Sequence, residues 1–73
     1  MQTFRDIIGL WPSHRAMAGD IGANHWAVAK WHQRDNIPPE WWNDVLAAAV
    51  RFGHEGLTAQ LMADIAGKRR EAA

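Results

Sequence analysis

Side chains suited to binding an anionic partner gather in one short stretch of the chain, residues 13–34. Cations outnumber anions in this stretch, which contains Arg15, Lys30 and Arg34 but only one acid, Asp20. Three of the four histidines of the chain also fall there, namely His14, His25 and His32. Ammonium, guanidinium and imidazole groups donate hydrogen bonds, and all of them can carry positive charge. The stretch therefore suits a partner that presents negative charge and hydrogen-bond acceptors.

Two tryptophans, Trp26 and Trp31, lie five positions apart within DIGANHWAVAKWHQR, residues 20–34. In a helix each residue turns the chain by about 100°, so the two indoles point about 140° apart. Trp31 shares an apolar arc with Val28, and we expect it to anchor the helix to a core. Trp26 shares the polar arc with Lys30, and we expect it to face a partner.

Composition gives a mixed indication about that partner. The chain has 73 residues, which suffice for one small domain. Lys and Arg total 8 and Asp and Glu total 8, so the net charge is zero. A neutral total argues mildly against nucleic-acid binding, whereas the local excess of cations in residues 13–34 favours it.

Apolar residues recur at helical spacing in five segments, residues 4–11, 14–21, 25–34, 40–52 and 59–66. Residues preferred as N-caps precede four of them, namely Thr3, Ser13, Asn24 and Thr58. No alternating strand pattern is present. We therefore predict a compact all-α domain of five helices.

Helix-stopping residues follow these segments. Pro12 is expected to end the first helix, Gly22 the second and Gly53 the fourth. We expect Gly67 to end the last helix, which makes residues 1–67 the domain and residues 68–73 a mobile charged tail. Gly19 is a poor helix former, and we expect it to let another helix approach closely.

Two short helices joined by a tight turn containing glycine, the second with a polar outer face, form a helix-turn-helix. The segment MAGDIGANHWAVAKWHQRDNIPPEWW, residues 17–42, resembles the helix-turn-helix of Cro-type and lambda-repressor-type regulators of phages and bacteria. The resemblance lies in a small residue, a turn glycine, a capping residue and three apolar positions: Ala18, Gly22, Asn24, Ile21, Val28 and Trp31. The IPPEWW segment is also similar to small Cro-like proteins.

The resemblance implies a lambda-repressor-like fold and a transcriptional regulator that binds double-stranded DNA. It further implies a repressor that acts as a homodimer on a palindromic operator. The base-reading positions of the family fall on His25, Trp26, Ala29 and Lys30. We predict contacts to the DNA backbone from His14, Arg15, Asn24, His32, Gln33 and Arg34.

The chain departs from the family pattern at His25 and Trp26, where many relatives carry Gln, Arg or Ser. An indole makes no bidentate contact to a base, but it can pack on a thymine methyl or a sugar and donate one N–H. Neutral His14 would add little salt-dependent affinity, whereas its protonated form would add a cation.

Other functions have less support in the sequence. The alternative is a protein-interaction module that binds another regulator or polymerase through its tryptophans without reading DNA, and zero net charge favours it. His25 and His32 lie seven apart on one helical face, but zinc sites need three or four ligands, so we predict no metal and no cofactor. The chain has no cysteine, nucleophile elbow or glycine-rich phosphate loop, and we predict no enzymatic activity.

Adjacent Trp41 and Trp42 cannot both point fully into a core from one helix. One of them is expected either at the rim of the core or, with Leu57 and Leu61, in a homodimer interface. No apolar run approaches the roughly 20 residues of a membrane helix. We expect a cytoplasmic, nucleoid-associated protein, and no small-molecule ligand because no sensor domain follows the motif.

Overall fold

A computed structural model describes residues 1–54 and 56–72 of the chain. Within these residues the secondary structure is helical, without strands. The elements, in chain order, are α1 (Phe4–Ile8), α2 (His14–Ile21), α3 (His25–Arg34), a short 3₁₀ helix η1 (Pro39–Trp41), α4 (Trp42–Arg51) and α5 (Ala59–Ala72). The prediction of a compact, five-helix all-α domain is confirmed.

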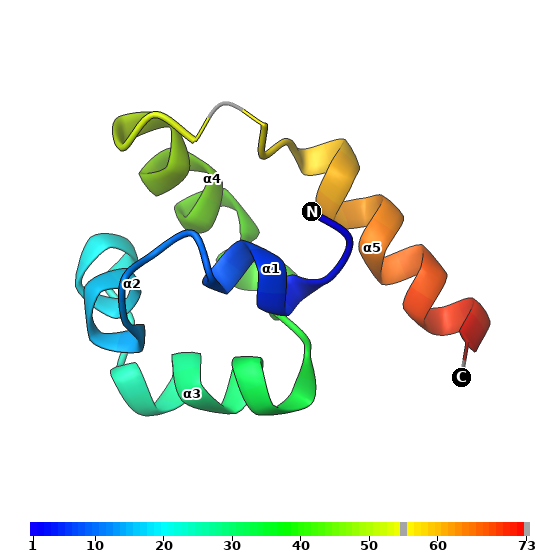
Figure 1. Cartoon of the computed structure of the whole chain (residues 1–73), viewed down its shortest axis with the longest axis horizontal. Coiled ribbons are helices and arrows are strands. Elements are labelled where there is room, and N and C mark those ends of the chain that lie inside the picture. The colour runs from blue at the N-terminus through cyan, green and yellow to red at the C-terminus, as the bar shows by residue number, and fades with distance from the viewer. Residues whose placement is uncertain (55, 73) are drawn as a thin grey trace.

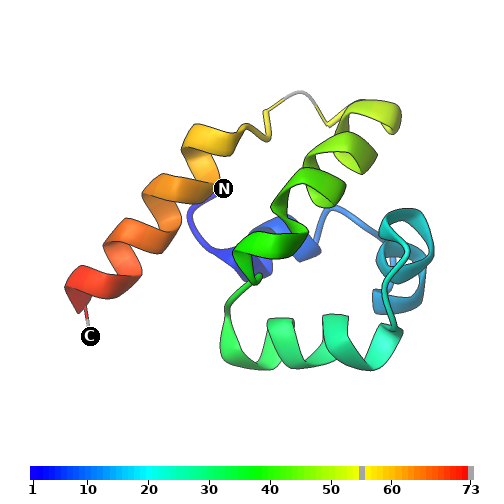
Figure 2. The same ribbon diagram turned by 180° about the vertical axis from the view of Figure 1, so that it is seen from behind.

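The helices surround one apolar core to which every α-helix contributes. α2 and α3 are consecutive and packed on each other, and α1 packs on α3 from the other side of the core. α4 packs against α2 and α5, while α5 lies beside the N-terminus (Figure 1). Seen from behind, α3 again forms one edge of the molecule (Figure 2). The side of α3 that faces away from α1 therefore carries no other helix.

The predicted N-caps begin the helices because their side chains accept hydrogen bonds from otherwise unpaired amides. Thr3 accepts from the amide of Asp6, and the Asp6 carboxylate accepts from the amide of Thr3, which completes a capping box. A hydrogen bond from the amide of Gln2 holds the pKa of Asp6 below its ordinary value. Ser13 caps α2, and Thr58 accepts from the amide of Leu61 at the start of α5.

The turn between α2 and α3 occupies only residues 22–24. Gly22 adopts a left-handed conformation with φ of 75°, as predicted for the residue that ends α2. The amide of Ala23 then donates to the carbonyl of Ala18 over 2.9 Å, which satisfies the end of the helix. Asn24 begins α3 immediately, because its side chain accepts from the amide of Trp26. Three residues, 22–24, therefore suffice to join α2 to α3.

Two predicted helix ends are wrong. α1 ends at Ile8, because the amides of Leu10 and Trp11 donate to carbonyls only three residues back and so tighten the chain before Pro12. α5 continues through Gly67 to Ala72, so most of the predicted charged tail is helical. Gly67 lacks the positive φ of a left-handed stop, and Arg69 donates to the carbonyl of Asp35 from the extended helix.

The expectation that Gly19 allows close helix approach is also wrong. A Cβ at Gly19 would meet no atom within 4 Å, and the residue is exposed on α2. Gly19 therefore gives the unfolded chain extra backbone freedom, and no close contact in the fold requires a glycine there.

We expect Gly19→Ala to raise the free energy of unfolding by about 0.5–1 kcal/mol, because alanine restricts the unfolded chain and fits the helix. Gly22→Ala is the matched control. It also meets open space, but its φ of 75° strains an L-residue, so this change should lower the stability. Urea unfolding followed by far-UV circular dichroism measures both, and a loss of stability in Gly19→Ala would contradict the assignment.

Candidate nucleic-acid interface

The orientation of α3 is set by its inward side chains. Val28 is fully buried and Trp31 is 7 % exposed, so both belong to the core. Trp26 lies about 200° around the helix from Val28 and is 68 % exposed. The two indoles thus lie where their spacing predicts, one inside and one outside.

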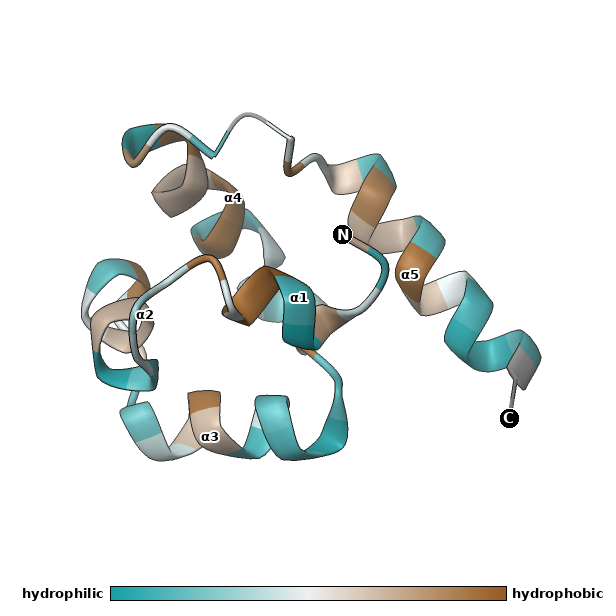
Figure 3. Cartoon of the chain, viewed as in Figure 1, coloured by the Kyte–Doolittle hydropathy of each residue, from teal (hydrophilic) through white to brown (hydrophobic). Residues whose placement is uncertain are grey.

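We call the side of α3 opposite Val28 the outer face of α3; it comprises Trp26, Ala29, Lys30, Gln33 and Arg34. Ala29 is half-buried and the other four are exposed. The ribbon of α3 is largely hydrophilic, with a hydrophobic segment in its middle (Figure 3). Figures 1 and 2 both show this helix at the edge of the fold, so the outer face is open to a large partner.

The start of α2 adds side chains beside this face. The rings of His14 and His32 lie 5.2 Å apart, which brings the first residue of α2 next to the last turn of α3. Arg15 follows on α2 and is exposed. The fold therefore brings two of the predicted backbone-contacting residues, His14 of α2 and His32 of α3, side by side.

Two other predicted site residues lie at the start of α3. The imidazole of His25 is half-buried and lies 4.7 Å from the indole of Trp26, with the rings tilted by 36°. Asn24 is exposed, but its Oδ1 accepts from the amide of Trp26 over 2.8 Å. Only the amide nitrogen of the Asn24 side chain is left to donate to a partner.

The acidic residues near this surface are engaged elsewhere. The Asp20 carboxylate accepts from Nε1 of Trp11 over 2.8 Å. The Asp35 carboxylate accepts from the amide of Arg5 over 3.0 Å. Both acids thus help to hold the fold, and the side chains presented around the outer face of α3 are cationic, imidazole, amide and aromatic groups.

Arg5 and Asp35 tie α1 to the end of α3, a link that the sequence analysis missed. Arg5 donates through Nε to the carbonyl of His32 over 2.7 Å and through its terminal nitrogen to that of Gln33 over 2.9 Å. Asp35 has a φ of 53°, so it ends α3 in the left-handed region while its side chain caps α1. We call these contacts the Arg5–Asp35 link. It positions the C-terminal end of the outer face.

We expect Arg5→Ala to lower the free energy of unfolding by about 1–2 kcal/mol, because it leaves two α3 carbonyls without their charged donor. Arg70→Ala on α5 is the matched control and should change the stability by less than about 0.5 kcal/mol. Thermal unfolding of both variants is the measurement. Equal stability of the two variants would show that the guanidinium of Arg5 contributes nothing to the Arg5–Asp35 link.

The candidate dimer residues are largely used by the monomer. Trp42 donates through Nε1 to the carbonyl of Ile37 over 2.7 Å, and its half-buried ring packs near Phe4. Trp41 is half-buried, with its ring 5.7 Å from that of Trp31.

Two leucines complete this candidate set. Leu57 is only 5 % exposed because its side chain packs into the core, so it offers almost no surface to a second copy. Leu61 is half-buried against the core. Two apolar side chains outside this candidate set are more exposed: Val50 at 75 % and Phe52 at 54 %.

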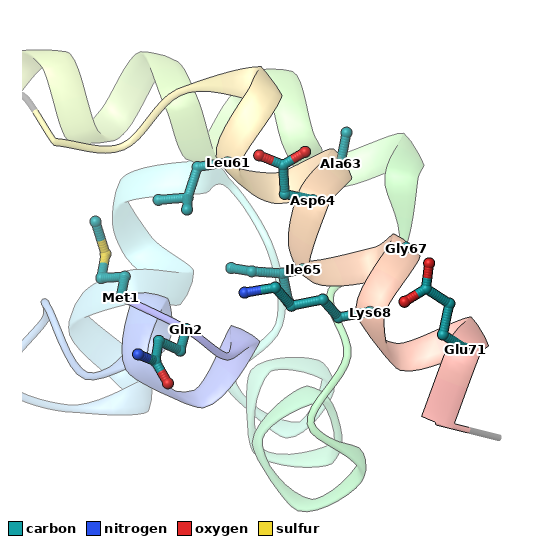
Figure 4. Close-up of a pocket in the computed structure, with 9 residues that line it drawn as sticks. All are labelled: Met1, Gln2, Leu61, Ala63, Asp64, Ile65, Gly67, Lys68 and Glu71. Carbon is teal, nitrogen blue, oxygen red and sulfur yellow. The ribbon is translucent and has the colours of Figure 1, made fainter.

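A separate open groove of about 450 Å³ lies between the N-terminus and α5 (Figure 4). Its lining mixes apolar and charged residues, namely Met1, Gln2, Leu61, Ala63, Asp64, Ile65, Gly67, Lys68 and Glu71. Of the predicted site residues, only Leu61 lines it. In residues 1–54 and 56–72 no three His, Asp or Glu residues converge as metal ligands do.

Comparisons of the chain with protein-family models, curated proteins and solved structures give no match. Among the helices that the structure describes, none is both long and apolar enough to cross a membrane.

Proposed function

We propose that the protein is a sequence-specific DNA-binding regulator of transcription, in which α2, residues 22–24 and α3 act as a helix-turn-helix. In this arrangement the second helix enters the major groove and its N-terminal residues meet base edges. α3 would be that helix, and α2 would cross the backbone. The resemblance of residues 17–42 to Cro-type and lambda-repressor-type regulators supports the same assignment.

One observation carries the proposal: α3 buries Val28 and Trp31, while Trp26 and Lys30 on its opposite side are exposed. An indole that is 68 % exposed buries little apolar area, so Trp26 adds little to the stability of the domain. A helix that enters a groove needs a long uncovered side with hydrogen-bonding and cationic groups.

The side chains divide by their position on this surface. His25, Trp26, Ala29 and Lys30 lie within the first six residues of α3, where they would meet base edges. Phosphate contacts would come from His14, Arg15, Asn24, His32, Gln33 and Arg34, which lie at the start of α2 or towards the ends of α3. Phosphate contacts would set the register, and base contacts would set the preference.

We further propose that two copies bind a palindromic site as a repressor. A two-fold dimer places its two groove-entering helices about 34 Å apart, one turn of DNA. Repression would follow from occlusion of polymerase at an overlapping promoter. This part of the proposal rests on the resemblance alone.

Selection of duplexes from a random pool tests the proposal. We expect a palindromic consensus whose half-sites lie one DNA turn apart. For each phosphate neutralised, a tenfold rise in salt concentration should lower the affinity by about 0.9 log unit. Absence of duplex binding at low salt would overturn DNA binding. A non-palindromic consensus would overturn the dimer and leave DNA binding intact.

The second candidate is a protein-interaction module, which the exposed Val50 and Phe52 at the end of α4 favour. This surface lies at the opposite end of the fold from α3 in Figure 1. If it were the functional surface, duplex binding would be absent or independent of sequence. The selection experiment therefore separates the two candidates.

A further inference from the structure

Trp26 differs from the rest of the outer face of α3 in being a large apolar ring. Its exposed neighbours on the helix are polar: Lys30 one turn on, then Gln33 and Arg34. The exposed Val50 and Phe52 belong to the end of α4, so they do not extend an apolar patch around the indole. A single ring among cations and amides suits a polyanion with isolated apolar groups better than an apolar protein surface.

The base of the Trp26 side chain is held in place. The amide of Trp26 donates to Oδ1 of Asn24 over 2.8 Å, which locks the first turn of α3. The imidazole of His25 lies 4.7 Å from the indole and restricts the directions the ring can take. Val28, two residues on, is fully buried and directs Trp26 away from the core. Such a braced ring loses little conformational freedom on binding.

The major groove offers an indole one apolar partner. Each base pair presents donors and acceptors there, and thymine adds a methyl group at C5. An indole has a single N–H donor and no acceptor, so it cannot make the bidentate contacts by which Arg or Gln read a base. Packing of the C5 methyl group on the indole ring would remove apolar surface from water, which makes the free energy of binding more favourable.

From this geometry we propose that Trp26 reads the C5 methyl group of a pyrimidine, thymine or 5-methylcytosine, in the major groove. The inference rests on the proposed DNA binding and adds the chemical group that α3 recognises. Lys30, one turn further along the same face, supplies the charge that holds the helix against the DNA. Trp26 thus reads the methyl group, while Lys30 meets a neighbouring base edge and adds its positive charge to the affinity.

The test starts from a duplex selected with the full chain. Each thymine of the half-site is replaced in turn by deoxyuridine, which removes only the methyl group. We expect one position to lower the affinity about fourfold, the value of one buried methyl group. At that position, a second pair of duplexes carries cytosine or 5-methylcytosine. If 5-methylcytosine raises the affinity over cytosine by the same factor as thymine does over deoxyuridine, the methyl group is read on either base. If only thymine raises the affinity, thymine is the base that is recognised.

Variants assign the effect to Trp26. Trp26→Ala should bind the thymine and deoxyuridine duplexes equally, while Lys30→Ala should bind both more weakly and keep the fourfold ratio. Trp26→Phe retains an apolar ring without the N–H, so it should keep part of the ratio. Because Trp26 is 68 % exposed, its variants should fold as the unmodified chain does, which thermal unfolding checks.

The outcomes separate the inference from the proposed function. Without duplex binding at low salt, the proposed function fails. If duplexes bind but no deoxyuridine lowers the affinity, or the ratio survives in Trp26→Ala, methyl recognition is wrong while DNA binding stands.

Discussion

Trp31→Ala is expected to lower the free energy of unfolding by about 3–5 kcal/mol, the usual cost of removing a large aromatic side chain from a core. Trp31 is 7 % exposed, and its ring lies 5.7 Å from that of Trp41. Alanine would leave a cavity between α3 and the segment that leads into α4. A domain of this size has only about 5 kcal/mol to lose, so much of the population should be unfolded. Urea unfolding followed by far-UV circular dichroism measures the loss.

Trp26→Ala is the control for this prediction, because it removes the same side chain five residues away on the same helix. Its indole is 68 % exposed, so the change in stability should stay within about 0.5 kcal/mol. A comparable loss of stability in the two variants would mean that both indoles are packed, and the outer face of α3 would then not be available to DNA.

Replacing Arg15 and Lys30 together by glutamine is expected to weaken binding to the selected duplex about 100-fold at moderate salt. Both side chains are exposed, one at the start of α2 and one on the outer face of α3. If each positive charge displaces about one counterion from the DNA, whether it lies at a phosphate or in the groove, the double change should also reduce the slope of log affinity against log salt by about 2. Fluorescence anisotropy of a labelled duplex over a salt series measures both quantities.

The charge-matched control replaces Lys68 and Arg70 on α5 by glutamine. It removes the same two charges from a different surface, so it should preserve the affinity within about threefold and leave the sequence preference unchanged. Equal losses from the two double variants would indicate general attraction between the protein and DNA, and would contradict a specific role for α3.

Local chemistry made several features predictable from the sequence. Thr3, Ser13, Asn24 and Thr58 begin helices because a side-chain oxygen satisfies an amide two or three residues along the chain. Gly22 ends α2 because it adopts the left-handed conformation that other residues avoid. These contacts lie within a few residues, so spacing alone identifies them.

The opposite directions of Trp26 and Trp31 were predictable for the same local reason, since the turn of a helix fixes the angle between them. The candidate site was therefore largely visible in the sequence. The spacing of residues along the chain could not predict the contact between His14 of α2 and His32 of α3 beside this face. That contact depends on how two helices pack.

Local sequence is enough to predict where most helices begin, how the short turn after α2 forms and which indole of α3 points inward. Only the packing of the helices shows that Arg5 reaches the carbonyls at the end of α3, and that α5 continues past Gly67. It also shows that Leu57 is buried. The physical reason is the range of the contacts: a cap or a helical face involves neighbours in the chain, whereas Arg5 and Asp35 lie 30 residues apart and meet only when the core assembles.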